Sequence, residues 1–249
     1  MVELNTLSSF FDGFIVKEGN YLDNFYFDLH FHTRASDGDV SEEFLQEFLR
    51  DKDYLISVTD HNSIEGNIKL RKKGLRVVPG LELGCEDGFE ILVYFKNEED
   101  MIKFYRAEVE PYKNRYRMAK TTRSVHEYIK ILRENYEVHI SIPHISGYAQ
   151  KNYLKNKEYI HEILQEVDAI EIYNHGLTYK KNLRAQILRK KYNLYGTFGS
   201  DGHCEREIKS YWRYLNRDDR GLTKTIDKIY KIKTVTDIGK KHFLHLFKR

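Results

Sequence analysis

A stretch of β-forming residues that ends in two histidines constrains this chain more than any other part of it. Residues 25–33 read FYFDLHFHT, and SDG follows at 36–38. Because alternate side chains of a strand lie on the same face, we expect His30 and His32 to be able to bind one metal ion together. Asp37, in the loop that follows, can supply an oxygen ligand. Histidines in strands are also common as ordinary core or surface residues, so this motif alone does not establish a site.

Strand and helix patterns alternate along most of the chain. After a first strand at 25–30, short apolar runs predict strands at 54–58, 75–78, 89–95, 138–142, 169–173 and 194–198. Between them, apolar spacing predicts helices near 41–49, 63–73, 156–166 and 178–191, and two helices within 98–135 around Pro111 and Thr121-Thr122. This alternation indicates an α/β fold with a mainly parallel sheet, open or closed into a barrel. No linker interrupts it, so we expect a single domain over 1–249, with core motifs at 25–205 and a C-terminal helical extension at 206–249.

Residue types that bind metals recur at or just past the ends of these predicted strands. Besides the first pair of histidines, they are His61, Glu82, His144, Asp201 and His203. The carboxyl ends of parallel strands meet at one rim of a barrel, where such folds build their active sites. Imidazoles and carboxylates together suit manganese, zinc or iron, with magnesium as a further option. Such ions can turn bound water into hydroxide at neutral pH.

Each of these residues also has an ordinary structural interpretation. His30 or His61 could be a hydrogen-bonded core residue. Asp37 and Asp201 could form turns within their Ser-Asp-Gly sequences, and Glu82 could be a solvated loop acid. The joint recurrence at strand ends favours a metal site over these separate explanations.

The composition excludes several classes of protein. An apolar fraction of 41% can form a buried core, and no apolar run approaches the length of a membrane span. The N-terminus lacks the form of a signal peptide, and with only Cys85 and Cys204 no disulfide framework is implied, so we expect a cytoplasmic protein. Both cysteines lie near metal motifs, but the other ligands suffice without them. The net charge of +3 does not by itself call for nucleic acid.

As a set, these motifs resemble the PHP superfamily (polymerase and histidinol phosphatase). The matching motifs are DLHFHT and SDG within 28–38, TDH at 59–61, PGLE at 79–82, PH at 143–144 and GSDGH at 199–203. The resemblance implies a distorted (β/α)7 barrel of the PHP type with two or three divalent metal ions, and so up to a trinuclear metal site at the C-terminal rim of the strands. It assigns the first ion to His30, His32, Glu82 and Asp201, the second to Glu82 and His144, and the third to Asp37, His61 and His203.

One position departs from the family pattern. Where the family usually has a histidine that binds the second ion, this chain has Glu90. Glutamate can still coordinate a divalent ion, with harder oxygen chemistry. We therefore retain Glu90 as an expected ligand, and the substitution bears on the occupancy and metal preference of the second site.

The resemblance is to stand-alone PHP phosphoesterases, because no polymerase domain is recognised. It implies a metal-dependent phosphoric ester hydrolase that acts on a phosphorylated small molecule or a nucleotide through a metal-bridging hydroxide. A nuclease or exonuclease acting on short single-stranded nucleic acid is the alternative, and a non-catalytic, metal-stabilised binding module is a third. Arg34 and Arg206 are candidate phosphate clamps, although solvent-facing arginines are as common. Asn174 and His175 are candidate contacts to substrate or metal, and His175 could equally be a loop residue with no such role.

A basic segment at 112–123 bears on the nuclease alternative. It contains Tyr112 and Tyr116 with the cations Lys113, Arg115, Arg117, Lys120 and Arg123. On a helix, Lys113, Arg117 and Lys120 would share a face that could follow a phosphate backbone. A solvated helix face is the simpler interpretation. The same two interpretations apply to the basic C-terminal tail, which includes Lys240, Lys241, Lys248 and Arg249.

Overall fold

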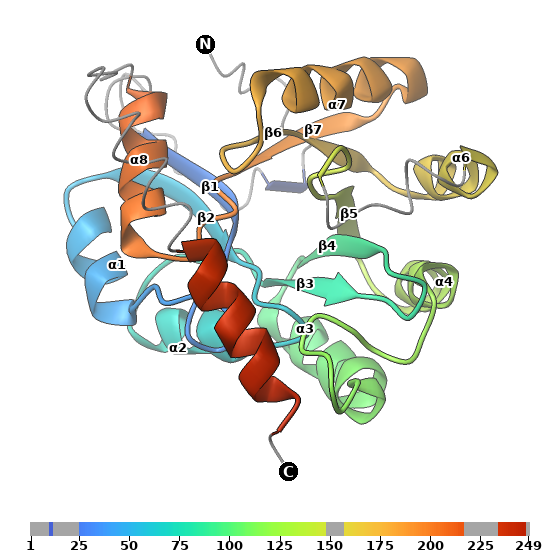
Figure 1. Cartoon of the computed structure of the whole chain (residues 1–249), viewed down its shortest axis with the longest axis horizontal. Helices are drawn as coiled ribbons and strands as arrows, with labels where there is room; N and C mark the ends of the chain where they lie inside the picture. Colours follow the sequence, from blue (N-terminus) through green and yellow to red (C-terminus); the bar gives the residue numbers. More distant parts are fainter. Residues whose placement is uncertain (1–9, 12–24, 148–156, 217–233, 248–249) are drawn as a thin grey trace.

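The strands and helices largely follow the predicted alternation. The computed structural model describes residues 10–11, 25–147, 157–216 and 234–247. Its strands are β1 (Phe25–Phe31), β2 (Asp53–Val58), β3 (Gly80–Gly84), β4 (Glu90–Phe95), β5 (Val138–Ile142), β6 (Ala169–Asn174) and β7 (Tyr195–Gly199). Its helices are α1 (Glu42–Leu49), α2 (Glu65–Lys72), α3 (Glu98–Phe104), α4 (Val125–Asn135), α6 (Lys157–Glu166), α7 (Tyr179–Tyr192) and α8 (Glu205–Leu215), with a further helix at 234–245 (Figure 1).

Polar side chains fix where helices begin. The Ser41 hydroxyl accepts a hydrogen bond from the Phe44 amide at 3.2 Å, which caps α1 where the sequence predicts it. Ser124 and Glu127 form a reciprocal capping box at the start of α4. These bonds satisfy amide groups of the first helical turn, which have no partner inside the helix.

The strands form two hydrogen-bonded sheets rather than a closed barrel. β1 and β2 pair in parallel, and a second sheet has the order β3-β4-β5-β6-β7. In the described part of the chain the two sheets are joined through short local contacts. The His32 amide donates to the Gly202 carbonyl (2.9 Å), and the Asn62 amide donates to the Glu82 carbonyl (2.8 Å). The mixed α/β class is as predicted, whereas the seven-stranded barrel is not confirmed, because the described residues connect the two sheets through isolated bridges and not through a continuous ladder.

β4 runs against both of its neighbours. It pairs antiparallel with β3 and β5, while β5, β6 and β7 run parallel to one another. A tight connection through Gly88, whose φ of 86° suits glycine, links β3 to β4. Since β4 is reversed, its first residue, Glu90, lies opposite Gly84 at the carboxyl end of β3. The reversal therefore places Glu90 at the edge where the other strands end.

The strand predicted at 75–78 is displaced along the chain. Only Val77 of this stretch forms an isolated bridge, to Ile56, and the strand itself begins at Gly80. Pro79, which has no amide hydrogen to donate, separates the two stretches. Glu82 consequently lies within β3 and not after it.

The two helices predicted within 98–135 are present as α3 and α4, but the stretch between Pro111 and Thr121-Thr122 is not the helix that the basic segment was expected to form. After α3 the chain makes a π-helical turn (Tyr105–Val109) and a 3-10 turn (Glu110–Tyr112), and then runs without helix until α4. Lys113 instead bridges Thr121, and the Asn114 amide donates to the Lys120 carbonyl (3.0 Å). Pro111, at the start of the 3-10 turn, disfavours continuation of the helix. The cations of the basic segment therefore do not share a helix face.

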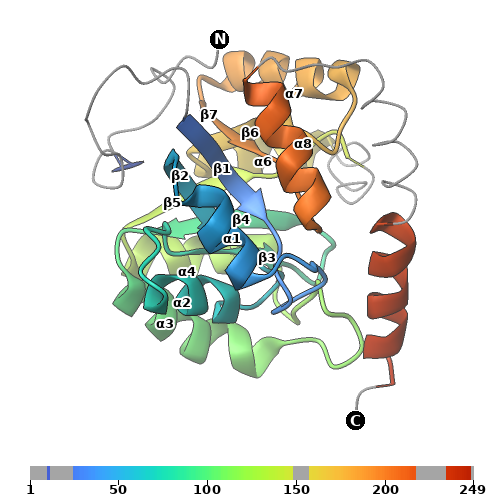
Figure 2. The same cartoon turned by 90° about the vertical axis from the view of Figure 1, so that its left-hand side faces the viewer.

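Buried apolar side chains fill the space on both sides of the sheets. The largest cluster joins β3, β4 and β5 to α3 and α4, with Ile91, Phe104 and Leu132 among its members. A second cluster joins β1 and β2 to α1 and α8, through residues such as Leu45 and Tyr211. Figure 2 shows α1 and α8 in front of these strands, and the 234–245 helix along one side of the molecule. Among the helices the structure describes, none is long and apolar enough to cross a bilayer.

Candidate metal centre

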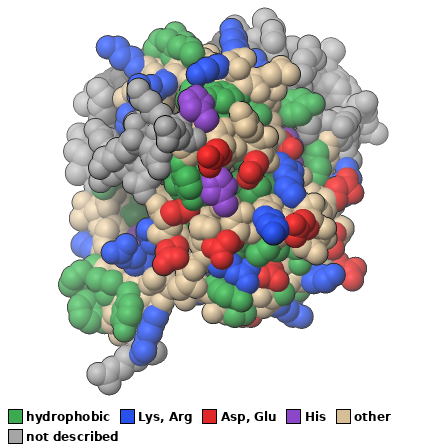
Figure 3. Space-filling model, turned by 90° about the vertical axis from the view of Figure 1, so that its right-hand side faces the viewer, with side chains coloured by type: hydrophobic (Ala, Val, Ile, Leu, Met, Phe, Trp, Pro, Cys, Tyr) green, Lys and Arg blue, Asp and Glu red, His purple; other side chains and the backbone are tan. Residues whose placement is uncertain are grey.

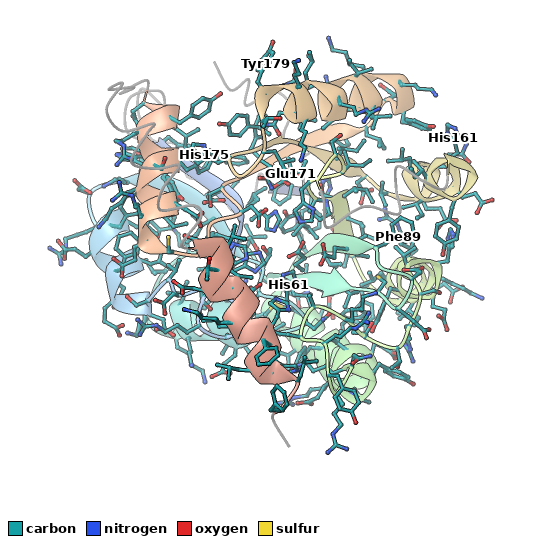
Figure 4. All side chains as sticks on the ribbon, in the orientation of Figure 1. His61, Phe89, His161, Glu171, His175 and Tyr179 are labelled. Atoms are coloured by element: carbon teal, nitrogen blue, oxygen red, sulfur yellow. The ribbon has the colours of Figure 1, made fainter. Side chains whose placement is uncertain are left out.

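The predicted ligands come together where the strands approach one another. They extend from five places in the fold: the end of β1 and its following loop, the residues after β2, the adjoining ends of β3 and β4, the residue pair after β5, and the loop after β7. These places supply His30, His32, Asp37, His61, Glu82, Glu90, His144, Asp201 and His203. In Figure 4, His61 and Glu171 lie near the middle of the molecule, whereas His161 and Tyr179 lie at its periphery.

The side chains form four overlapping groups, each with ligand atoms all within 4.8 Å of one another. The groups are His32-Asp37-His61-His203, His30-His32-Asp201, His30-Glu82-His144 and His61-Glu82-Glu90. All nine predicted ligands are included. Four residues, namely His30, His32, His61 and Glu82, belong to two groups each. The four groups therefore form one continuous cluster. His32 belongs both to a group with His30 and Asp201 and to the group with Asp37 and His203, which the resemblance assigns to the third ion. His61 belongs both to that group and to one with Glu82.

Several buried atoms of this cluster need a partner that the described protein atoms do not supply. His32 Nδ1, His61 Nδ1 and Glu82 Oε2 are buried and make no hydrogen bond within the described part of the chain. Glu82 Oε2 lies 3.0 Å from His61 Nδ1, but the pair lacks hydrogen-bond geometry. Leaving such atoms unsatisfied costs about 1–3 kcal/mol each. Divalent cations bound by imidazole and carboxylate would satisfy them, so the residues present fit the metal that the motifs imply.

The charges around Asp37 are arranged to keep its carboxylate ionised. Burial opposes ionisation, but His61 and His203 outweigh it and hold the pKa of Asp37 well below its ordinary range. Burial likewise opposes protonation of His203, yet Asp37 raises the pKa of His203 to about 10. The nearest atoms, Asp37 Oδ1 and His203 Nε2, are 3.5 Å apart. A cation entering this group would displace the proton of His203, and its binding would strengthen as the pH rises.

Two carboxylates share the centre of the cluster. Burial would raise the pKa of Glu82, but His61 and His30 hold it well below its ordinary range. Burial and the charge of Glu82 raise the pKa of Glu90 to about 7. Like charges in a buried site oppose each other's ionisation unless a cation lies between them. A positive charge placed between Glu82 and Glu90 would therefore relieve their mutual repulsion.

The backbone adopts unusual conformations at two candidate ligands. His144 has φ 29° and Asp201 has φ 52°, both in the left-handed region that side-chain-bearing residues rarely occupy. The surrounding hydrogen bonds hold them there: the His144 amide donates to Glu171 Oε2 (2.7 Å), and the Asp201 amide donates to the His30 carbonyl (2.7 Å). Such conformations collect at functional sites, where the rest of the fold compensates for them.

Glu171, on β6, supports the cluster but was not among the sequence predictions. Its Oε1 lies 2.9 Å from His30 Nδ1, and its Oε2 accepts from the His144 amide (2.7 Å) and from Asn174 Nδ2 (2.9 Å). A carboxylate on Nδ1 leaves Nε2 of His30 as the nitrogen for a metal. The available signal was an acidic residue within the apolar strand AIEIYN.

Two buried aspartates fix the loops that carry ligands. Asp60 accepts hydrogen bonds from the Thr33 amide (2.7 Å) and from the hydroxyls of Thr33 (2.7 Å) and Ser36 (2.7 Å), beside Asp37. Asp28 accepts from Tyr26 Oη (2.6 Å) and from the Ser200 amide (2.9 Å), beside Asp201. Both aspartates belong to the recognised motifs, and their contacts show a positioning role for them.

The helix at 234–245 contacts the cluster from outside the motif region. His242 Nε2 lies 3.0 Å from Asp37 Oδ2, and Lys241 donates to the Gly38 carbonyl. The His242 and His61 rings are 6.3 Å apart, centroid to centroid. Sequence reasoning treated the lysines here as a basic tail and missed His242, because nothing local links position 242 to position 37.

The four predicted substrate residues lie in different environments. Arg34 is exposed and its Nε donates to Asp39 Oδ1 (3.3 Å). Asn174 is buried, and its amide nitrogen lies 3.2 Å from Asp201 Oδ2, which places it beside the ligand cluster. His175 has its two ring nitrogens near Tyr173 Oη (3.1 Å) and Ser210 Oγ (3.0 Å), on the side of α8. Arg206 lies in the first turn of α8.

The two cysteines are free and apart from the ligand groups. Cys85 is buried, and Cys204 precedes α8 with its sulfur 3.6 Å from the Thr234 hydroxyl. Neither belongs to a metal-binding group of the described residues. The interpretation that their proximity to metal motifs is fortuitous agrees with this placement.

The fold matches solved structures of metal-dependent hydrolases at low sequence identity. No family model matches the sequence, and no curated protein does. A candidate metal-dependent phosphoesterase from Bifidobacterium adolescentis has a TM-score of 0.56 at 16% identity, over 74% of this chain and 89% of that one. A two-domain protein from Bacteroides vulgatus that contains a predicted PHP-like metal-dependent phosphoesterase has a TM-score of 0.52 at 16% identity, over 78% and 58%. The lesion-specific endonuclease PfuEndoQ from Pyrococcus furiosus has a TM-score of 0.56 at 15% identity, over 72% and 48%.

These likenesses define the class of fold. It is one on which metal-dependent phosphoesterases and an endonuclease are built. More narrowly, the chain has the fold of the PHP-like metal-dependent phosphoesterases, so the resemblance carried by its motifs is confirmed at the level of the fold.

Proposed function

We propose that this protein is a metal-dependent phosphoesterase that hydrolyses phosphate esters of a small metabolite or a nucleotide. The observation that carries the proposal is the cluster of nine histidine, aspartate and glutamate side chains in four overlapping groups. The PHP-like fold supports it, since the candidate phosphoesterase from Bifidobacterium adolescentis and the phosphoesterase-containing protein from Bacteroides vulgatus have this fold. The proposal takes the chain as one domain with the cluster as its active site.

The proposed centre holds two or three divalent ions, with manganese, zinc or iron favoured by the donor set and magnesium as a further option. Bound there, such ions would supply Lewis-acid charge for phosphoryl oxygens and would lower the pKa of water. The protein's own residues hold the donors in place. Glu171 orients His30, Asn174 lies against Asp201, and Asp60 fixes the loop of Asp37.

Hydrolysis of generic phosphate esters by protein loaded with Mn²⁺ tests the proposal. We expect turnover of mono- or diesters, and a loss of at least about a hundredfold in His32→Ala and in Asp201→Ala, because each removes a donor from the cluster. Circular dichroism would confirm that both variants are folded. No turnover of any ester by the wild-type protein, or full activity in both variants, would contradict the proposal.

A nuclease that acts on short single-stranded nucleic acid is the second candidate. It is favoured by the likeness to PfuEndoQ, which is described as a lesion-specific endonuclease. Among the described side chains on the face that Figure 3 shows, acidic and basic groups are interspersed and form no continuous basic stripe. Comparing rates on monoesters and diesters, and then on nucleotides and oligonucleotides, separates the two candidates. An oligonucleotide affinity that falls steeply with salt would favour the nuclease. Metal binding that stabilises the fold without any hydrolysis would instead identify a non-catalytic binding module.

A further inference from the structure

A loop at 113–121 is fixed against the strand that carries Glu82. The Thr121 amide and hydroxyl both donate to the Gly84 carbonyl, at 2.9 and 2.8 Å. The Asn62 side chain, next to His61, donates to the Met118 carbonyl at 2.9 Å. The loop is neither helix nor strand. Its path is nevertheless fixed by β3 and by the residues after β2, which also position the candidate ligands Glu82 and His61.

A pocket of about 210 Å³ lies between this loop, the start of β4 and the 234–245 helix. Its lining residues are Gly88, Phe89, Glu90, Arg117, Ala119, Lys120 and His242. Two of them reach the ligand cluster from different sides. Glu90 belongs to the group with His61 and Glu82, and His242 lies 3.0 Å from Asp37. The pocket is thus adjacent to the proposed metal centre.

The two cations of the pocket are available to an anionic ligand. Lys120 Nζ lies 3.2 Å from the Glu86 carbonyl oxygen, a neutral acceptor, and Arg117 is exposed. In the described ranges, neither cation forms an ion pair with a carboxylate, unlike Arg123 of the same segment, which pairs with Glu108. Glu90 lines the same pocket and also belongs to the group with His61 and Glu82, so the pocket that holds the two cations adjoins the cluster.

We propose that this pocket binds the non-reacting part of the substrate and selects small phosphate esters that carry a second anionic group. Arg117 and Lys120 hold that second group, a carboxylate or another phosphate, while the scissile phosphate lies at the ligand cluster. The inference rests on the proposed phosphoesterase function and names its substrate class. The volume supports a small molecule, because pockets for larger, drug-sized ligands span about 300–1,000 Å³.

Matched pairs of esters test the inference by binding, without requiring turnover. Titration calorimetry on Mn²⁺-loaded protein would compare 3-phosphoglycerate with glycerol 3-phosphate, which lacks the carboxylate. Fructose 1,6-bisphosphate would be compared with fructose 6-phosphate in the same way. In at least one pair we expect the ester with the second anion to bind about tenfold or more tightly, as charge-assisted contacts give. In the double variant Arg117→Ala/Lys120→Ala, the affinities for the two esters of that pair should differ by no more than about threefold.

Arg115→Ala is the matched control, because Arg115 is exposed on the same loop and does not line the pocket. This variant should keep the wild-type preference and the wild-type rate on p-nitrophenyl phosphate. Equal affinities within both pairs in the wild type, or an unchanged preference in the double variant, would overturn the inference. Hydrolysis measured in parallel separates the two proposals. A binding preference without any turnover would support the pocket inference and contradict the proposed phosphoesterase function. Turnover without a binding preference would support the phosphoesterase function and contradict the pocket inference.

Discussion

Glu171 determines which nitrogen of His30 can face a cation. One of its oxygens contacts His30 Nδ1, while the other accepts from the His144 amide and from Asn174. Glutamine has a single acceptor oxygen. In Glu171→Gln the side-chain NH2 group would therefore point at a donor, either His30 Nδ1 or the pair formed by the His144 amide and Asn174. We expect Mn²⁺ affinity to fall by about 10–100-fold, as is typical when the partner of a metal-binding histidine is changed.

Calorimetric titration with Mn²⁺ measures this effect, and Glu134→Gln, at an exposed position on α4, is the control. An affinity in Glu171→Gln equal to that of the wild type would show that His30 does not need this carboxylate.

His139, on β5, makes stability depend on pH away from the ligand cluster. Its ring is buried among Phe10, Phe11 and Tyr94, and burial lowers its pKa to about 4. Between that value and the unfolded pKa of about 6.5, the unfolded chain binds a proton that the folded chain does not. This contribution to the free energy of unfolding is therefore complete above pH 6.5 and falls by up to about 3 kcal/mol as the pH drops toward 4.

Urea denaturation at pH 7.0 and at pH 4.5 would measure this loss in the wild type and in His139→Phe. We expect the variant to lose less stability than the wild type over this interval. Equal losses in the two proteins would mean that His139 is protonated in the folded state.

At the residue scale, sequence reasoning named the candidate donors that belong to short motifs, and it did not name the residues whose place beside them is defined only by folding. His30, His32 and Asp201 are adjacent to recognisable neighbours in the sequence. Glu171 has no motif of its own, and an acid in a strand ordinarily predicts a solvent-facing position. His242 lies 205 residues beyond its contact, Asp37, so no spacing rule connects the two.

At the level of elements, close approach between β3 and the 113–121 loop depends on Gly84. A Cβ at this position would collide with the Ala119 carbonyl oxygen, which is backbone and cannot rotate away. We expect Gly84→Ala to lower the free energy of unfolding by about 1–3 kcal/mol, as overpacking does. Because the loop must shift, the preference for esters with a second anion should fall as well.

Gly239→Ala provides the contrast, since no atom lies within 4 Å of a Cβ added there. In the 234–245 helix this change should stabilise by up to about 1 kcal/mol. Chemical denaturation measures both variants, and a Gly84→Ala protein as stable as the wild type would mean that the loop adapts without cost.

The elements themselves were predictable where the local pattern was unambiguous. β5 has the predicted bounds, and α7 and β6 differ from theirs by a residue or so. The reversed direction of β4 was missed because the alternation of strand and helix elsewhere in the chain favours parallel pairing. The short connection through Gly88 was the available signal, since parallel neighbours need a crossover of about a dozen residues or more. The basic segment at 112–123 was expected to be helical because its charges suit a helix. Its structure depends instead on two distant partners, Gly84 and Asn62.

For the whole molecule, bound cations should contribute directly to stability. The cluster gathers elements from β1 to β7, so an ion bound there favours the folded chain over the unfolded one. At a free concentration one hundred times its Kd, one ion adds about 2.7 kcal/mol. For a chain of 249 residues this corresponds to a melting temperature higher by about 5–10 °C.

Differential scanning fluorimetry with EDTA, and then with added Mn²⁺ or Zn²⁺, measures the shift. We expect the shift to be lost in a His30→Ala/His32→Ala variant, whereas an identical shift in that variant would place the ions elsewhere on the protein.

The overall architecture shows where sequence reasoning stops. The α/β class and the meeting of the ligands followed from alternation and from strand ends. Whether the strands close into a barrel did not follow from these patterns, because closure depends on whether neighbouring strands pair along their length. Among the described strands, β1 meets the β7 side of the second sheet at the isolated bridge between Phe31 and Gly202, a long-range pairing that no local sequence pattern specifies.

The contact of the 234–245 helix with Asp37 and Gly38 bears on how fast cations enter the cluster. His242 and Lys241 hold this helix against the loop that carries one candidate ligand. A variant cut before residue 234 lacks both contacts, so we expect its metal-free form to take up Mn²⁺ faster than the full sequence does. Stopped-flow mixing measures the two rates, and equal rates would mean that ions enter from another side.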